Sequence, residues 1–99
     1  MPAEELTVGA YAFRFLTNPL QVWEEGQAMR HCAHDLVPKC AAGVCWVVSV
    51  KRKGIRVATL ELRLSNAQWR INQLWGKCNS DPKKVVWLCA FRLLKGLTI

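Results

Sequence analysis

Apolar and polar residues alternate along three stretches in the second half of the chain, a pattern typical of β-strands with a buried face. Residues 44–52 (VCWVVSVKR) are β-branched and mostly apolar, which favours a central strand. Residues 55–64 (IRVATLELRL) and 69–75 (WRINQLW) alternate more regularly, and short turn sequences separate the three stretches. Together they predict an antiparallel meander.

Regular alternation assigns each side chain of these strands to one of two faces. In residues 55–64 the more aliphatic set is Arg56, Ala58, Leu60, Leu62 and Leu64. The opposite set is Ile55, Val57, Thr59, Glu61 and Arg63. In residues 69–75 alternation groups Trp69, Ile71, Gln73 and Trp75 against Arg70, Asn72 and Leu74. Thr59, Glu61 and Arg63 are therefore expected on one polar face, with Asn72 or Gln73 nearby.

The first half of the chain predicts one strand and then a helix. Aromatic residues at alternate positions of residues 10–16 indicate the strand. Thr17 or Asn18 can cap the helix, Gly26 can divide it, and Pro38 ends its pattern. The better apolar stripe of this helix is Val22, Met29, Cys32, Ala33 and Leu36.

A second amphipathic helix is predicted near the end of the chain, with Ser80 or Asp81 as its cap and Gly96 as its end. Its apolar positions are Val85, Val86, Leu88, Cys89, Phe91 and Leu93. The predicted order is β-α-β-β-β-α. This order favours an α+β fold in which the helices pack on one face of an antiparallel sheet of three to four strands.

The composition predicts a folded domain without a membrane segment. A hydrophobic fraction of 52% and five tryptophans argue against disorder. Apolar runs such as residues 44–50 are far shorter than the roughly 20 residues that span a bilayer. The N-terminal MPAEELTVGA lacks the positive and apolar regions of a secretory signal, and the five cysteines are odd in number. We therefore expect a cytoplasmic protein with reduced thiols.

The net charge of +7 is unevenly distributed. Four of the seven acidic residues lie in the first 25 positions, whereas the chain from Lys39 onward has twelve basic residues and two acidic ones. This asymmetry indicates a polyanionic partner such as nucleic acid or a nucleoprotein complex, because phosphate neutralisation dominates nucleic-acid affinity. A basic surface that only maintains solubility is the alternative. The predicted binding set is Lys51, Arg52, Lys53, Arg56, Arg63, Arg70, Lys77, Lys83 and Lys84. Trp69 and Trp75 beside Arg70 suit base stacking.

Residues 29–45 (MRHCAHDLVPKCAAGVC) hold three cysteines and both histidines of the chain. The candidate zinc ligands are Cys32, His34, Cys40 and Cys45. Their spacing lacks the paired C-x₂-C form of common zinc sites. Cysteines that act as small core residues are therefore favoured over zinc, and no cofactor is expected.

The same segment raises the question of nucleophilic catalysis. His31 and Cys32 are adjacent, so on a helix their side chains diverge by about 100°. A catalytic pair needs the imidazole within hydrogen-bond reach of the sulfur. His31 and Asp35, four residues apart, are the better local pair.

Several short motifs occur in a defined order along the chain. They are Glu25–Gly26, His31–Cys32, Ala58–Thr59–Leu60, and the set Gln73, Gly76 and Asn79. This order resembles the PcfJ-like family, whose members are associated with conjugative plasmids, phages and other mobile elements. The resemblance implies that residues 1–99 form a single PcfJ-like domain.

Charge and resemblance together predict a small basic accessory protein of a phage or mobile element that binds nucleic acid or a nucleoprotein complex without catalysis. An inhibitor of host defence would fit the size and charge. One alternative is an enzyme with a polar pocket of His31, Cys32, Gln73 and Asn79, which Thr59 could join. Hydrogen bonds that only lock the fold are the simpler explanation of such a pocket. The other alternative is an interaction module that docks an acidic protein.

Overall fold

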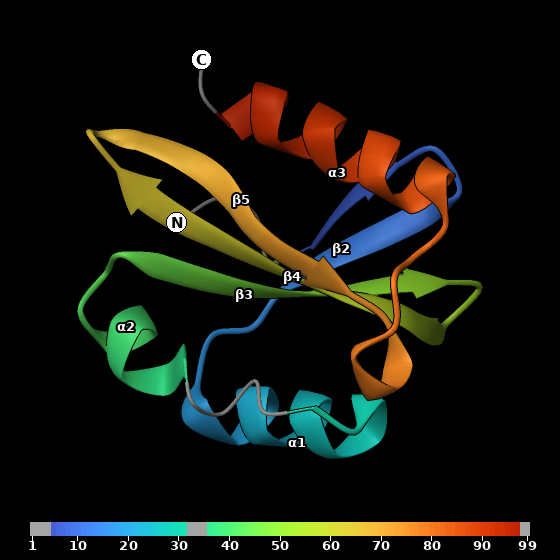
Figure 1. Cartoon of the computed structure of the whole chain (residues 1–99), viewed down its shortest axis with the longest axis horizontal. Helices are drawn as coiled ribbons and strands as arrows, with labels where there is room; N and C mark the ends of the chain where they lie inside the picture. The colour runs from blue at the N-terminus through green and yellow to red at the C-terminus, as the bar shows by residue number, and fades with distance from the viewer. Residues whose placement is uncertain (1–4, 32–35, 98–99) are drawn as a thin grey trace.

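The computed structural model describes residues 5–31 and 36–97, which form an α+β fold with a five-stranded sheet and three α-helices (Figure 1). The elements in chain order are β1 (Glu5–Val8), β2 (Tyr11–Phe15), α1 (Pro19–Met29), α2 (Val37–Ala41), β3 (Cys45–Arg52), β4 (Ile55–Ser65), β5 (Gln68–Trp75), the 3₁₀ helix η2 (Lys77–Asn79) and α3 (Lys84–Leu97). The α+β prediction is confirmed. The observed order is β-β-α-α-β-β-β-α, so the predicted order lacked one strand and one helix.

The sheet is an antiparallel meander whose spatial order follows the chain, β1-β2-β3-β4-β5. The prediction of three to four strands is wrong because it omits β1, which is only four residues long. β1 pairs with β2 through a tight turn in which Gly9 has a φ of 61°. Glycine adopts this left-handed conformation without steric cost.

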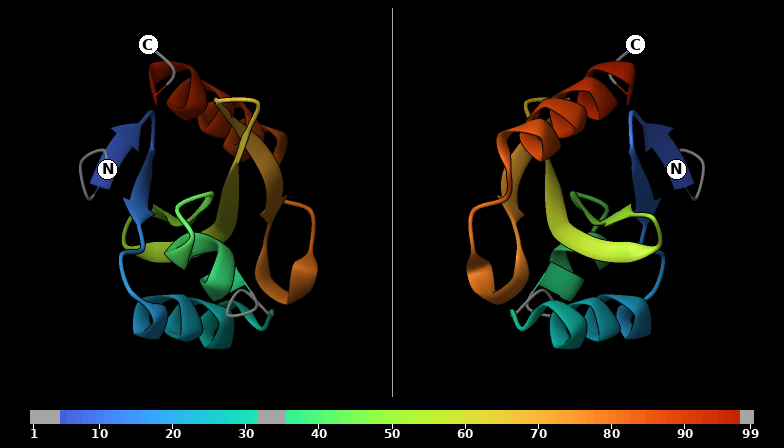
Figure 2. Two further views of the ribbon diagram at one scale, coloured as in Figure 1. Left: turned by 90° about the vertical axis from the view of Figure 1, so that its left-hand side faces the viewer. Right: turned by 90° about the vertical axis from the view of Figure 1, so that its right-hand side faces the viewer.

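Helices cover both faces of the sheet, so the prediction that they pack on one face is wrong. Figure 1 shows α3 on one side of the sheet and α1 with α2 on the other. Figure 2 shows that the sheet curves around α3, which contacts both edge strands, β1 and β5. Both faces of β3 are apolar enough to be buried: Val48 and Val50 lie on the α3 face, and Cys45 and Val47 on the other.

The main hydrophobic core lies between α3 and the sheet. α3 contributes Val86, Cys89, Ala90 and Leu93, a spacing that places one helical stripe against the strands. The sheet contributes residues from four strands: Tyr11, Phe13, Phe15, Val48, Val50, Ala58, Leu60, Leu62 and Leu74. The other predicted apolar positions of this helix, Val85, Leu88 and Phe91, are exposed.

The observed helix ends confirm some predicted boundaries and correct others. Asn18 caps α1 by accepting a hydrogen bond from the Gln21 N–H at 2.9 Å. Gly26 does not divide α1, which runs to Met29. Pro38 does not end a helix: it lies in the first turn of α2, where its missing N–H is tolerated.

The last helix begins later and ends later than predicted. It starts at Lys84, and Gly96 lies inside it. The carboxylate of Asp81 accepts a hydrogen bond from the Trp87 indole at 3.2 Å. None of the helices among residues 5–31 and 36–97 is long and apolar enough to span a bilayer.

Two β-bulges change which side chains face each helix. The β3–β4 register shifts between Val50 and Lys51, which leaves Val57 as the extra residue of β4. The β4–β5 register shifts between Glu61 and Leu62, which leaves Asn72 as the extra residue of β5. Each bulge reverses the alternation beyond it.

The predicted face assignments are therefore wrong near both bulges. Arg56 lies on the α1 face with Thr59, whereas Val57 packs against the α3 core. In β5, Gln73 and Trp75 share the α1 face, while the core contacts of Trp69, Ile71 and Leu74 place them on the α3 face.

Candidate functional site

The α1 face of the sheet carries a set of buried polar side chains, here called the polar layer. Its members are Glu25, His31, Ser49, Thr59 and Glu61, and none is more than 7% exposed. The strand register places three of them in neighbouring positions, because Ser49 lies opposite Thr59, and Glu61 is two residues further along β4. Buried polar groups are costly without partners, so their hydrogen bonds determine what this layer can do.

A continuous chain of hydrogen bonds runs through the first half of the polar layer. The Arg56 Nε–H donates to Glu25 Oε1 at 2.9 Å. The Thr59 hydroxyl donates to Glu25 Oε2 at 2.5 Å, and His31 Nε2 lies 2.8 Å from the Thr59 oxygen. A hydroxyl has a single hydrogen, which Thr59 gives to Glu25, so His31 Nε2 must carry the hydrogen that it shares with Thr59.

The end of α1 directs His31 towards the sheet. Arg30 adopts a left-handed conformation with φ 56° and ψ 53°, and the His31 N–H donates to the Gly26 carbonyl at 3.0 Å. The imidazole packs against the Trp75 ring, with centroids 4.9 Å apart. Burial lowers the pKa of His31 below its ordinary value of 6.5, an effect that the Glu25 charge partly opposes.

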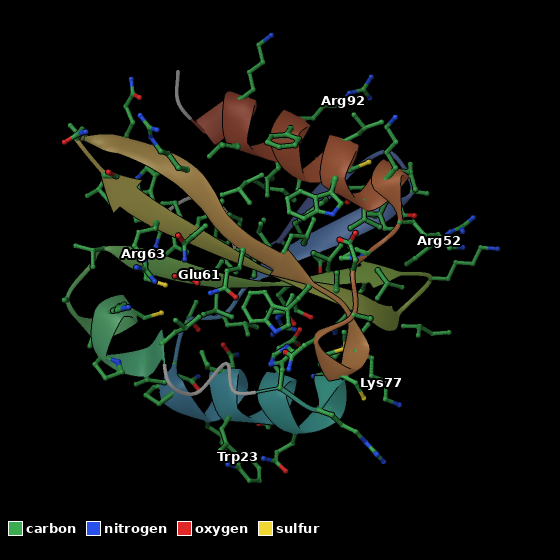
Figure 3. All side chains as sticks on the ribbon, in the orientation of Figure 1. Trp23, Arg52, Glu61, Arg63, Lys77 and Arg92 are labelled. Carbon is green, nitrogen blue, oxygen red and sulfur yellow. The ribbon has the colours of Figure 1, made fainter. Side chains whose placement is uncertain are left out.

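The second half of the polar layer centres on Glu61. Arg63 donates from Nε to Glu61 Oε2 at 3.0 Å, and its terminal nitrogen also contacts that oxygen. Asn72, the bulged residue of β5, donates to Glu61 Oε1 at 3.0 Å. Figure 3 shows Glu61 and Arg63 close together, at the level of β3 and β4. The extra residue of the bulge thus provides one of the hydrogen-bond partners of Glu61.

A pair of thiols adjoins Glu61. The Cys45 thiol lies 3.7 Å from Glu61 Oε2 and also contacts Cys40. Its hydrogen bond with Cys40 raises the pKa of Cys45, and burial raises it further. The same hydrogen bond lowers the pKa of Cys40. Cys45 packs with Val22 and Val47, as expected of a small core residue.

The predicted zinc ligands are only partly placed by the structure. Cys40 and Cys45 are neighbours, whereas Cys32 and His34 lie outside the described residues. Within the ranges 5–31 and 36–97, no group of three or more His, Cys, Asp or Glu side chains is arranged to hold a metal ion.

The predicted polar pocket is assembled in part. His31 meets Thr59, and it borders a shallow surface depression of about 440 Å³ lined also by Gly26, Gln27 and Arg30. Cys32 and Asp35 lie outside the described residues. Gln73 is opposite Glu61 in the register but its side chain is exposed, and Asn79 is exposed in η2, which contacts α1.

Two of the nine predicted binding cations are tied to the polar layer. Arg56 pairs with Glu25 and Arg63 with Glu61, so their charges are largely matched locally. Arg70 lies opposite Arg63 near the far end of the β4–β5 pair. Lys51 lies opposite Arg56 in the register. Trp69 stacks on Trp46, with centroids 4.0 Å apart, so Trp69 and Trp75 do not form one stacking face.

The remaining five cations come from the β3–β4 hairpin, η2 and the start of α3. We call them the basic edge: Arg52, Lys53, Lys77, Lys83 and Lys84, all exposed. Arg52 and Lys83 line one cavity of about 240 Å³ beside Asp81. Figure 3 places Arg52 and Lys77 on the same side of the molecule and Arg63 on the opposite side.

Sequence reasoning missed Glu25 as a buried group. Its position held a signal, because Glu25 follows Val22 by three residues and precedes Met29 by four, which is the phase of the apolar stripe. An acidic residue in that phase indicates a buried carboxylate that needs a partner. The partner, Arg56, was assigned to the wrong face because the Val57 bulge was not foreseen.

The comparisons with known proteins agree with these motifs. No curated protein and no solved structure matches the chain. A family model described as PcfJ-like protein matches residues 3–86. The matched region contains α1, the polar layer and η2, where the motif residues Glu25, Thr59 and Gly76 are located. The match covers most of the length of the chain, and the chain therefore belongs to the PcfJ-like family.

Proposed function

We propose that the protein is a non-catalytic accessory of a mobile element that binds nucleic acid, alone or in a nucleoprotein complex, through the basic edge. The observation that carries this proposal is the cavity shared by Arg52 and Lys83. These residues are far apart in the sequence, yet they line the same cavity, and Lys53, Lys77 and Lys84 are each adjacent in sequence to a residue of that lining. Converging cations of this kind neutralise phosphates without reading bases.

The local charge balance supports the basic edge as the binding surface. The cavity that Arg52 and Lys83 line has one acidic residue, Asp81, whose carboxylate already accepts a hydrogen bond from Trp87. By contrast, Arg56 and Arg63 are held by buried carboxylates and are less available to a phosphate. We therefore expect weak sequence preference and strong dependence on salt.

The polar layer fits a structural role in this proposal. Glu25, Thr59 and Glu61 are fully buried, and each has a polar partner. Satisfied buried networks of this kind fix the position of a helix on a sheet. α1 is thereby held over β4.

Oligonucleotide binding across a salt series tests the proposed function. A double variant, R52A/K83A, removes two charges from the basic edge. Lys39→Ala with Arg92→Ala is the matched control, because both side chains are exposed and lie outside the basic edge. We expect R52A/K83A to bind single- and double-stranded oligonucleotides more weakly and to reduce the salt slope by about 2, while the control changes little. Equal losses in the two variants, or no binding at low salt, would contradict the proposal, and the latter would favour an acidic protein partner.

The depression beside His31 favours one second candidate, an enzyme that uses the imidazole. This candidate requires His31 to meet a substrate at the depression lined by Gly26, Gln27 and Arg30. Its test is the reactivity of the neighbouring Cys32 towards a thiol-labelling reagent as a function of pH, in the parent and in the H31Q variant. The pH dependence of labelling gives the pKa of the Cys32 thiol. A pKa well below 8.5 in the parent, and a higher pKa in H31Q, would support a thiolate stabilised by His31. An unreactive Cys32 would count against catalysis.

A further inference from the structure

A small polar cavity opens between α1 and the β2–β3–β4 part of the sheet, apart from the basic edge. It has a volume of about 200 Å³ and is lined by Arg14, Leu16, Gln21, Glu24, Ser49, Lys51 and Arg56. The strand register builds it, since Arg14 lies opposite Ser49 and Lys51 lies opposite Arg56. Three cations from three adjacent strands therefore converge on one hollow.

Ser49 distinguishes this cavity from an ordinary basic surface. The residue is 1% exposed, and its hydroxyl is the one buried side-chain oxygen or nitrogen among the described residues that has no hydrogen-bond partner. A buried hydroxyl without a partner is unfavourable, because it has lost its bonds to water and gained none. An oxygen-rich ligand at this position would supply the missing partner.

The charged residues around the hollow indicate that such a ligand would carry a negative charge. Arg14, Lys51 and Arg56 face two carboxylates, the exposed Glu24 on the lining and the buried Glu25 that pairs with Arg56, so the hollow keeps a formal excess of one positive charge. Glu25 matches the charge of Arg56 and holds it in place through the Nε–H bond, while the guanidinium keeps further N–H donors beside the hollow. We propose that this cavity binds a phosphate group, whose several oxygens can accept from the cations and from the Ser49 hydroxyl together.

This inference does not depend on the proposed function, because none of the cavity residues belongs to the basic edge. The phosphate can come from inorganic phosphate or from the terminal phosphate of a nucleotide. Both sources present the same oxygens to Arg14, Ser49 and Lys51. The experiment therefore includes an arm for each source.

Titration with inorganic phosphate, followed by amide NMR shifts at constant ionic strength with chloride as the reference anion, tests the site. We expect phosphate-specific shifts around Ser49 and Lys51, and about tenfold weaker binding in K51A. Lys53→Ala is the matched control, because it lies two residues further along the chain, outside the cavity lining. Glu24→Gln should bind phosphate more tightly, since it removes one of the two opposing charges.

The Ser49→Ala variant keeps the test decisive if K51A alters the hairpin. It removes only the hydroxyl, so it should fold and bind phosphate more weakly.

In the nucleotide arm, a 5′-phosphorylated dinucleotide should shift the same amides more than its unphosphorylated form if the terminal phosphate is the ligand. R52A/K83A should retain phosphate binding, which separates this inference from the proposed function. The site would be ruled out if phosphate and chloride gave identical amide shifts, or if S49A, K51A and the parent bound phosphate with equal affinity.

Discussion

The two faces of the sheet use the same strands for different purposes. On the α3 face, β3 and β4 present Val50 and Leu60 to a continuous hydrophobic core. On the α1 face, the residues next to them in sequence, Ser49, Thr59 and Glu61, are equally buried but polar. One face gains stability from apolar area, whereas on the other Thr59 and Glu61 have hydrogen-bond partners and Ser49 has none. The two faces are therefore equally buried but held together by different kinds of interaction.

The polar layer has a specific cost and a specific benefit. Transferring a carboxylate out of water is unfavourable, and a buried ion pair often contributes little net stability. Glu25 and Glu61 each meet an arginine and at least one further donor, so neither charge is left unmatched. We infer that the layer defines where α1 lies and that the α3 face provides most of the free energy of unfolding.

The largest expected effect comes from the α3 face. Leu60 is fully buried in the centre of this core, and Leu60→Ala should lower the free energy of unfolding by about 2–5 kcal/mol through lost burial and a cavity. Urea denaturation measures the change. Leu88→Ala on the exposed side of α3 is the control and should alter stability by less than about 0.5 kcal/mol. Similar losses in both variants would contradict the assignment of this core.

A smaller effect is expected when the Glu25–Arg56 pair is broken. Arg56→Leu leaves the buried Glu25 carboxylate without its cation, and we expect a loss of about 1–3 kcal/mol, since Arg56 is itself partly exposed. Adding Glu25→Leu in the same chain should restore most of that loss, because it removes the unmatched charge. A double-mutant cycle by urea denaturation measures the coupling. Simple additivity of the two changes would contradict a direct pair.

The pH dependence of stability tests His31. Its folded-state pKa is lowered below 6.5 by burial, an effect that the nearby Glu25 charge partly opposes. Below pH 6.5 the unfolded chain therefore binds a proton that the folded protein resists, so the free energy of unfolding falls as the pH falls from 6.5 towards the folded-state pKa. His31→Gln should flatten this part of the profile. An H31Q profile identical to the parent's would show that His31 contributes nothing to it.

The smallest effect concerns the backbone at the end of α1. Arg30 has a left-handed conformation that non-glycine residues adopt at a cost, so Arg30→Gly should raise the free energy of unfolding by up to about 1 kcal/mol. Gln27→Gly, inside the same helix, should lower it by about 1 kcal/mol. Thermal denaturation measures both changes: the melting temperature should rise in the Arg30→Gly variant and fall in the Gln27→Gly variant. Destabilisation by both substitutions would show that Arg30 side-chain contacts outweigh the backbone term.

Much of the fold can be predicted from the sequence, because local patterns determine it. The meander from β3 to β5 follows from alternation and from two hairpin turns, Lys53–Gly54 and Asn66–Ala67, whose residues all have positive φ. The motifs in residues 3–86 identify the PcfJ-like family, as the sequence had indicated.

Other features cannot be predicted from the sequence, because they depend on contacts between segments that are distant in the chain. Nothing local predicts that one extra residue at Val57 or Asn72 will reverse a strand's faces. The location of α3 on the side opposite α1 depends on how both faces of β3 are covered. The pairing of Glu25 with Arg56 joins residues 31 positions apart, and the Ser49 cavity forms only when three strands and α1 meet.

The protonation state of the His31 ring tests the polar layer most directly. Nitrogen-15 NMR of the imidazole, recorded from pH 5 to pH 8, reports both the tautomer and the pKa. The hydrogen-bond chain Arg56–Glu25–Thr59–His31 predicts a neutral ring at pH 7 with its hydrogen on Nε2 and a pKa below 6.5. A ring with its hydrogen on Nδ1, or one that titrates above 6.5, would contradict the account.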